Sequence, residues 1–342
     1  MPITGAYGGV IGVDNTPTSS KSVTQITSSG CFCRTTATAT VVVIAGGGSG
    51  CYGGGGAGGV LVTTCHPLPA STVPVTIGAG GGTITSEAVG NAGNNTVFGS
   101  ATPLTALKGM GGGGGNSYPV SDGPQQPAGT SAYDGGIYGS GGGSGGANPA
   151  AGGKGTHPGP YGGCSPTYQG SPGGHSAYAT GGGACNLGLG HGNSSNKNHG
   201  GRGRDLTPLG VPTDMGDCGI FGGGGGAKTS AGELYTPGVP LTDQSSGIGK
   251  KAAGGGGRGQ TGTNDVLTFC CVALGSSVGD ANTGGGGGAG TFNDSPNGVG
   301  DVDGMAGGSG TVLVIQDVAG ASANDGIYSM KEHYICVKSS RW

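Results

Sequence analysis

The sequence predicts a mainly irregular and β-rich fold, in which extended glycine helices pack side by side on a small β-sheet base. Three observations predict it. Glycine makes up 90 of the 342 residues. Most of these glycines fall in short pure tracts, and segments with strand character flank the glycine-rich region on both sides. The clearest tracts occupy residues 46–48, 53–56, 80–82, 111–115, 141–146 (interrupted by Ser144), 181–183, 222–226, 254–257 and 284–288.

The glycine tracts favour packed helices of the polyproline-II type over collagen and over disorder. Collagen needs a strict Gly-X-Y repeat with abundant proline, but the run at 222–226 breaks that frame and the chain has only 19 prolines. The strand-like segments and the regular tract spacing argue against a disordered chain. A polyproline-II helix has no internal hydrogen bonds. Its N–H and C=O groups must therefore bond to neighbouring helices, and glycine lets those neighbours approach closely.

Five segments read as strands because they are rich in β-branched residues and bounded by glycine or proline. They occupy residues 38–45 (TATVVVIA), 60–64, 72–77, 95–98 and 311–316 (TVLVIQ). Four precede the long glycine region and one follows it. We therefore expect both ends of this region to meet in one β-base, with 311–316 close to 38–45. The base would supply the apolar core that glycine helices lack.

If successive glycine tracts run alternately away from the base and back, the segments between them fall at alternating ends. The tract at 307–310 enters the last strand, so it runs toward the base and fixes the parity. The expected basal segments are 83–110, 184–221 and 258–283, and the expected distal segments are 116–140, 156–178, 227–253 and 289–306. Within 184–221, the stretch Gly-Arg-Gly-Arg at 201–204 is interpreted as a solvated loop rather than a nucleic-acid-binding segment.

The C-terminus has a different character. Residues 329–340 have a short helical pattern, with Ser329 and Glu332 at the spacing of a capping box. The expected organisation of the chain is an N-terminal attachment segment (1–30), a β-base (31–110), a glycine-helix region with variable loops (111–310), a closing strand and linker (311–325) and a C-terminal helical module (326–342).

Composition and motifs give no sign of catalysis. The stretch 222–229 (GGGGGAKT) departs from a phosphate-binding loop because Ala227 stands where the motif needs glycine. Asp294, Asp301 and Asp303 fit a solvated acidic turn better than a calcium site, since the EF-hand order is absent. We therefore expect a protein that is not an enzyme, with no cofactor, no metal site and no nucleic-acid partner. No apolar stretch is long enough to cross a membrane, so we expect no membrane insertion.

Ten cysteines leave two alternatives open. None forms a CxxC pair, which argues against a zinc site. The cysteines could act as disulfide staples in a chain with little core, or several could be small buried apolar residues. Cys31 and Cys33 alternate as they would on one face of a strand.

Several stretches in combination resemble the glycine-rich tail-fibre and adhesin proteins of tailed bacteriophages. They are residues 26–32 (ITSSGCF), 41–50 (VVVIAGGGSG), 57–61 (AGGVL), 75–82 (VTIGAGGG), 93–99 (GNNTVFG) and 307–315 (GGSGTVLVI). The final 326–342 is similar to a terminal module of marine phage structural proteins, although Tyr328-Ser329-Met330 replaces the usual Trp-Ser-Leu. The resemblance implies a polyglycine-II helix sandwich on a small β-base, with distal loops that contact the host.

The resemblance and the residue pattern together predict a virion tail fibre or tip adhesin that recognises a host cell-surface receptor, either a carbohydrate or an outer-membrane protein. Other virion tail or fibre proteins would be partners, and the terminal segments would form a homo-oligomer. The chain would be made in the host cytoplasm and be extracellular on released virions. The alternative is a structural protein that forms an extracellular filament or an ice-binding surface. Aromatic residues in the expected distal segments are the candidate receptor-binding residues: Tyr118, Tyr133, Tyr138, Tyr161, Tyr168, Tyr178, Tyr235 and Phe292.

Overall fold

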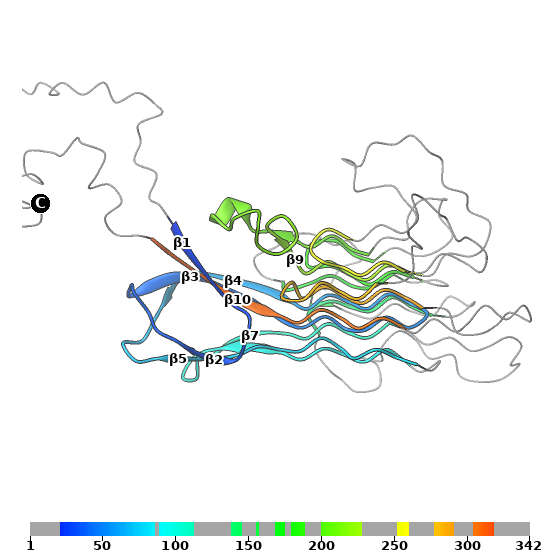
Figure 1. Ribbon diagram of the computed structural model, residues 1–342, viewed down its shortest axis with the longest axis horizontal. Coiled ribbons are helices and arrows are strands. Elements are labelled where there is room, and N and C mark those ends of the chain that lie inside the picture. Colours follow the sequence, from blue (N-terminus) through cyan, green and yellow to red (C-terminus); the bar gives the residue numbers. More distant parts are fainter. Residues whose placement is uncertain are drawn as a thin grey trace, which may run out of the picture.

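The computed structural model places a β-sandwich at one end of the molecule and a bundle of extended, glycine-rich segments that run away from it (Figure 1). Within the described residues there is no α-helix. The described residues are 21–85, 89–112, 138–145, 155–156, 168–174, 179–188, 200–227, 252–259, 277–290 and 304–317. The predicted C-terminal helix at 329–340 lies outside them.

The first sheet of the sandwich joins the two ends of the described chain. Its order is β1 (Lys21–Ile26), β10 (Thr311–Asp317), β3 (Thr38–Ile44) and β4 (Val60–Pro67), and all neighbours are antiparallel. Val314 lies opposite Val41. The prediction that the last strand pairs beside residues 38–45 is therefore confirmed.

The second sheet has the order β2 (Gly30–Phe32), β5 (Val73–Thr76), β6 (Thr96–Phe98) and β7 (Leu104–Ala106). The sequence did not predict β1, β2 or β7. The strand β1 (KSVTQI) has no adjacent run of apolar residues and no buried residue, and β2 and β7 are only three residues long. All three are too short or too polar to stand out before their pairing partners are known.

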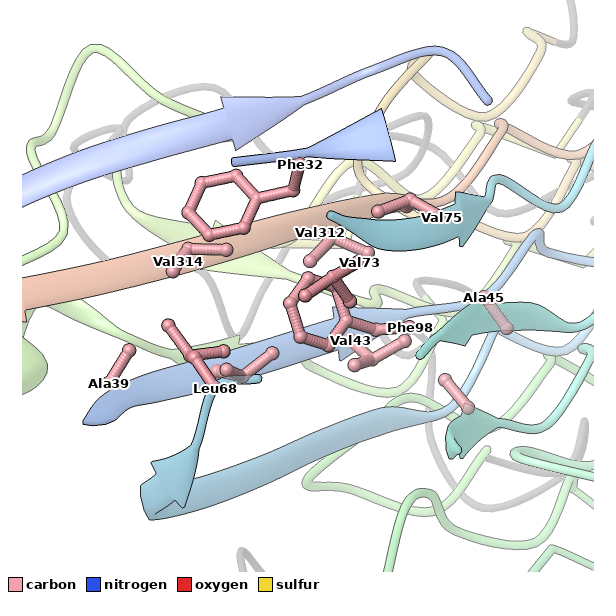
Figure 2. Packing of buried hydrophobic residues seen from close by; sticks show 12 residues of the cluster. Phe32, Ala39, Val43, Ala45, Leu68, Val73, Val75, Phe98, Val312 and Val314 are labelled. Carbon is pink, nitrogen blue, oxygen red and sulfur yellow. The ribbon is translucent and has the colours of Figure 1, made fainter. Parts of the chain in front are cut away.

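A hydrophobic core lies between the two sheets (Figure 2). Val41 and Val43 of β3 point into it, together with Val312 and Val314 of β10. Phe98 of β6 is fully buried there, and its ring centroid lies 6.1 Å from that of Phe32. This core is the apolar base that the sequence predicted.

The alternate residues of the same strands are also buried because a third layer covers the other face of the first sheet. This layer contains β8 (Arg204–Asp205), a 3₁₀ helix (Thr207–Leu209) and β9 (Ile220–Phe221). Residues from both sides form a second core: Val42, Ile44, Val60, Ala184, Leu206, Val211, Phe221, Leu313 and Ile315. Burial on both faces explains why β3 and β10 are continuous apolar runs rather than alternating ones.

The glycine-rich bundle is the set of extended segments that continue from these strands. It comprises residues 45–50, 53–59, 77–82, 89–95, 107–112, 138–145, 168–174, 179–184, 200–203, 222–227, 255–259, 277–280, 284–290 and 304–310. These segments carry hydrogen bonds to one another rather than within themselves. Residues 200–203 belong to this bundle and Arg204 to β8, so the interpretation of 201–204 as a solvated loop is wrong.

The hydrogen bonds of segment 53–59 follow a threefold rotation. Successive N–H groups donate to three different neighbouring segments and then return to the first. The bonds run from Gly54 to Ala179, Gly55 to Gly287, Gly56 to Met110, Ala57 to Gly182, Gly58 to Gly284 and Gly59 to Leu107. A β-strand would bond alternately to two sides, whereas a helix with three residues per turn faces three sides in rotation.

Segment 45–50 repeats the same rotation with other partners. The bonds run from Ala45 to Gly59, Gly46 to Asn94, Gly47 to Gly308, Gly48 to Gly56, Ser49 to Asn91 and Gly50 to Met305. Each of these segments therefore connects several parts of the chain that are distant in sequence. Hydrogen bonds thus connect neighbouring segments in two directions perpendicular to the length of the bundle.

Glycine is required in the bundle because neighbouring backbones occupy the space of a side chain. A Cβ added to Gly55 would overlap the carbonyl oxygen of Gly48, and one added to Gly225 would overlap that of Gly287. On the outer surface the restriction disappears. A Cβ at Gly82 would meet nothing closer than the Asn91 side chain, at 3.9 Å.

The sequence-based count of directions is wrong for part of the bundle. Segment 255–259 was predicted to run toward the base. Gly223 donates to Gly254 and Gly226 donates to Gly257, so this segment runs parallel to 222–227, which leaves β9 away from the base. The return pass is 277–280, which contains only one glycine. A return segment on the outside of the bundle tolerates side chains, so it is not a pure glycine tract. Such segments were therefore left out of the sequence-based count.

The described cysteines include examples of both alternatives that the sequence left open, a disulfide bond and a small buried residue. Cys185 takes part in a disulfide bond, while Cys51 is fully buried. Cys31, Cys33, Cys65 and Cys218 are exposed free thiols.

Gln169 joins the bundle to the sandwich and gives a first test of the fold. Its Nε2 donates to the Thr105 carbonyl at 3.1 Å, its Oε1 accepts from the Leu107 N–H at 2.8 Å, and its own carbonyl accepts from the Val60 N–H. Gln169→Ala leaves two backbone groups of the β7 edge unpaired. We expect a loss of about 1–3 kcal/mol in the free energy of unfolding, measured by denaturant titration. A loss no larger than that of Val278→Ala, at a half-exposed position, would contradict this role.

Candidate functional site

The two ends of the glycine-rich bundle differ in what they contain. At the base end, Lys21 of β1 lies opposite Asp317 of β10, so the first and last described residues meet there. The distal end is where the chain reverses farthest from the sandwich. It is defined by the turn at Cys51, whose N–H donates to Gly53, and by the bridge between Ile84 and Gly304.

A small apolar cluster closes the described part of the distal end. Cys51, Tyr52 and Ile84 pack together and are each buried. The Cys51 carbonyl accepts from the Gly290 N–H, which connects this cluster to segment 284–290. Thr83 and Thr85 on either side of Ile84 are exposed. A buried apolar cluster with exposed threonines beside it thus holds the described segments of the distal end together.

The sequence analysis did not include these distal residues among its candidates. A signal for them was present, since Cys51-Tyr52 is a two-residue interruption between the glycines of 46–50 and those of 53–56. Such a short insert leaves room only for a tight reversal. This signal was missed because only the longer, tyrosine-rich segments were considered as distal loops.

Several described segments end at the distal end: 107–112, 138–145, 168–174, 222–227, 255–259 and 284–290. The chain continues from each of these ends into residues that lie outside the described part. Of the candidate receptor-binding residues, Tyr118, Tyr133, Tyr178, Tyr235 and Phe292 follow these ends in the sequence. Tyr161 lies outside the described part as well, but the described residues on its two sides, Thr156 and Tyr168, both lie at the base end. The acidic residues Asp294, Asp301 and Asp303 also lie outside the described part.

The prediction that Tyr138 and Tyr168 lie at the distal tip is wrong. Gly139, next to Tyr138, donates to Lys108 just beyond β7, and Gln169, next to Tyr168, bonds to β4 and β7 residues. Both tyrosines therefore lie at the base end. Tyr138 is only 5% exposed, with the Lys108 ammonium 5.3 Å from its ring centroid. The sequence analysis had the tract 141–146 running toward the base and the whole of 156–178 at the tip, whereas 138–145 and 168–174 both run from the base toward the distal end.

Titratable groups with a shifted pKa lie in the sandwich and the third layer. Burial lowers the pKa of His66 in β4 and that of Arg204 in β8. The Thr207 hydroxyl and N–H both donate to the Asp205 carboxylate, which lowers the pKa of Asp205. These groups shape the base end and not the distal end.

A family model described as Glycine-rich domain matches residues 18–316, from just before β1 into β10. The chain belongs to this glycine-rich domain family. The match thus covers both sheets and the whole described bundle of the glycine-rich domain. No curated protein and no solved structure matches the chain.

The part of the chain that the structure describes contains no helix long and apolar enough to cross a membrane. No group of three or more His, Cys, Asp or Glu side chains there is arranged to hold a metal ion.

Proposed function

We propose that this glycine-rich domain is a phage tail fibre or tip adhesin that is held at its base end and presents its distal end to a receptor on the host cell. The observation that carries the proposal is the polarity of the molecule. The two ends of the described chain meet at Lys21 and Asp317, whereas the reversals at Cys51 and Ile84 lie at the opposite end. A module built this way can be attached at one end while it binds at the other.

The bundle supports the proposal as a rigid support for binding loops. Its threefold hydrogen-bond rotation and its exclusion of Cβ atoms are the features expected of a polyglycine-II helix sandwich. We infer this packing for the whole bundle. Binding residues commonly lie on loops that a rigid scaffold positions, and six described segments of the bundle end at the distal end.

The sequence resemblance to phage tail-fibre adhesins supports the same function. Aromatic rings in the residues beyond the distal ends give large contact areas with few rotatable bonds, and they suit either a carbohydrate or an outer-membrane protein. Repeated copies on one virion would raise a weak single-site affinity through effective concentration. The remaining candidate residues beyond the distal ends are Tyr118, Tyr133, Tyr178, Tyr235 and Phe292.

The test compares two sets of tyrosines in the purified chain. We expect Tyr118→Ala, Tyr178→Ala and Tyr235→Ala together to weaken binding to host cells at least ~30-fold, because one hot-spot tyrosine contributes about 2 kcal/mol. The melting temperature should not change. The matched control is Tyr168→Ala at the base end, which should keep its affinity.

Two outcomes would contradict the proposal. Unchanged binding of the triple variant would exclude these rings as the receptor site. Equal loss in the triple variant and in Tyr168→Ala would show that binding does not depend on the distal end. A chain that polymerises into filaments without binding cells would favour the alternative of an extracellular structural protein.

A further inference from the structure

We propose that the open edge of β2 pairs with β2 of a second copy of this chain, and that Cys31 and Cys33 then join the two copies through a symmetric pair of disulfide bonds. The proposal is independent of the function proposed above.

The two thiols point away from the core. Cys31 and Cys33 are exposed and free, while Phe32 between them is buried at 8% exposure in the core of the sandwich. Since side chains alternate along a strand, Cys31 lies on the outer face of β2, and Cys33, the residue directly after β2, is exposed on the same side of the buried Phe32 if the chain continues extended.

These cysteines cannot bond to each other within the strand. Two residues on the same face of a strand are ~6.6 Å apart, and their Cα–Cβ bonds are nearly parallel. A disulfide needs Cβ atoms about 3.5–4.5 Å apart. Each thiol therefore requires a partner from elsewhere.

The strand β2 is the edge of its sheet, with β5 on its only paired side. Cys31 lies opposite Pro74, which has no N–H to donate. The Pro74 carbonyl accepts from Gly99 at 2.9 Å and so points away from β2. The Cys31–Pro74 pair is consequently the non-hydrogen-bonded type, and the N–H and C=O of Cys31 point toward the open edge.

A second copy fits this edge with the thiols in register. In an antiparallel pairing with its twofold axis at Phe32, Cys31 of each copy lies opposite Cys33 of the other. Directly opposite residues of a hydrogen-bonded pair have Cα atoms about 5.5 Å apart, within the disulfide range of about 4.4–6.8 Å. Their Cβ atoms lie about 4.5–5.5 Å apart, so the two strands must approach closely at this pair to reach the roughly 4.5 Å upper limit for a disulfide. The same axis therefore produces two equivalent bonds.

Formation of each bond needs a disulfide oxidant such as oxidised glutathione. The Cys31 thiolate attacks a glutathione sulfur, and one glutathione thiolate leaves. Cys33 of the second copy, as its thiolate, then attacks the Cys31 sulfur of this mixed disulfide and displaces the second glutathione. Two protein thiols lose two protons and two electrons, and one oxidised glutathione becomes two reduced molecules.

The experiment incubates the full chain with oxidised glutathione and follows dimers by non-reducing electrophoresis and intact mass. We expect the parent to form a dimer that dithiothreitol reverses. Cys31→Ser alone and Cys33→Ser alone should each remain monomeric, because each lacks one half of the pair. A mixture of the two variants should regain the dimer, since Cys33 of one meets Cys31 of the other. The control Cys65→Ser should dimerise like the parent.

Several results would overturn the proposal. They are a parent chain that only acquires glutathione, a single variant that dimerises by itself, a mixture that stays monomeric, and a double variant lacking both cysteines that still dimerises. All of these substitutions are at exposed positions, so circular dichroism of each variant should match the parent.

Discussion

Gly224→Ala should lower the free energy of unfolding by about 3 kcal/mol, at the upper end of the effect of overpacking a core. Gly224 is buried in the bundle, and an added methyl group would lie 2.7 Å from the carbonyl carbon of Gly181 and still closer to its oxygen. That oxygen accepts from the Gly201 N–H at 2.8 Å. The methyl group can fit only if this lateral bond opens, and Gly224→Val should be more destabilising still.

The matched control is Gly82→Ala, at a glycine of the same bundle where a Cβ has no neighbour within 3.9 Å. This variant should be neutral or slightly stabilising, by about 0.4–1 kcal/mol, since alanine restricts the unfolded chain. Both variants are measured by denaturant titration with the parent. Equal stability of Gly224→Ala and Gly82→Ala would mean that the bundle does not exclude side chains at Gly224.

Phe98→Ala should have the largest effect in the sandwich, a loss of about 3–5 kcal/mol. Phe98 is fully buried in the strand between β5 and β7, and its ring lies near Phe32 and 6.2 Å from the His66 ring. Removing it leaves a cavity between the sheets that no neighbouring backbone can fill. Phe98→Leu should recover part of the loss because it restores most of the volume.

The comparison for this second prediction is Val278→Ala, at the half-exposed valine, where the change should stay within about 0.5 kcal/mol. If Phe98→Ala melts like Val278→Ala, the two sheets do not share the core described above. Hydrogen exchange would add a further distinction. Loss of the Phe98 ring should raise exchange in β3 and β10, which contribute to the same core.

The strands that the sequence predicted are those buried by apolar packing. Val41 to Ile44 and Val312 to Ile315 are covered on both faces, so the chain needs β-branched residues there throughout and the pattern is unmistakable. The strand β1 has only one hydrogen-bonded neighbour and no buried residue. Its existence depends on pairing with β10, almost 300 residues later, and no local pattern encodes that contact.

The sequence predicted that the glycine-rich region consists of extended segments bonded to one another, but it did not predict the direction of every segment. Glycine is needed wherever neighbouring backbones surround a segment, as at Gly55, and pure tracts therefore mark the interior of the bundle. Outer passes such as 277–280 accept side chains and look like ordinary loops. The number and direction of the passes set which end each loop reaches, and the reversed direction of 138–145 and the unrecognised segment 168–174 moved Tyr138 and Tyr168 to the wrong end.

The most direct test of the proposed function is to locate the two ends of the molecule on virions that carry the chain. Antibody fragments against the base segment 65–72 and against the distal segment 81–85 are compared by electron cryo-tomography. Both labels should lie on tail fibres, with the distal label farther from the particle than the base label. Labels on free filaments alone, or a distal label closer to the particle, would contradict it.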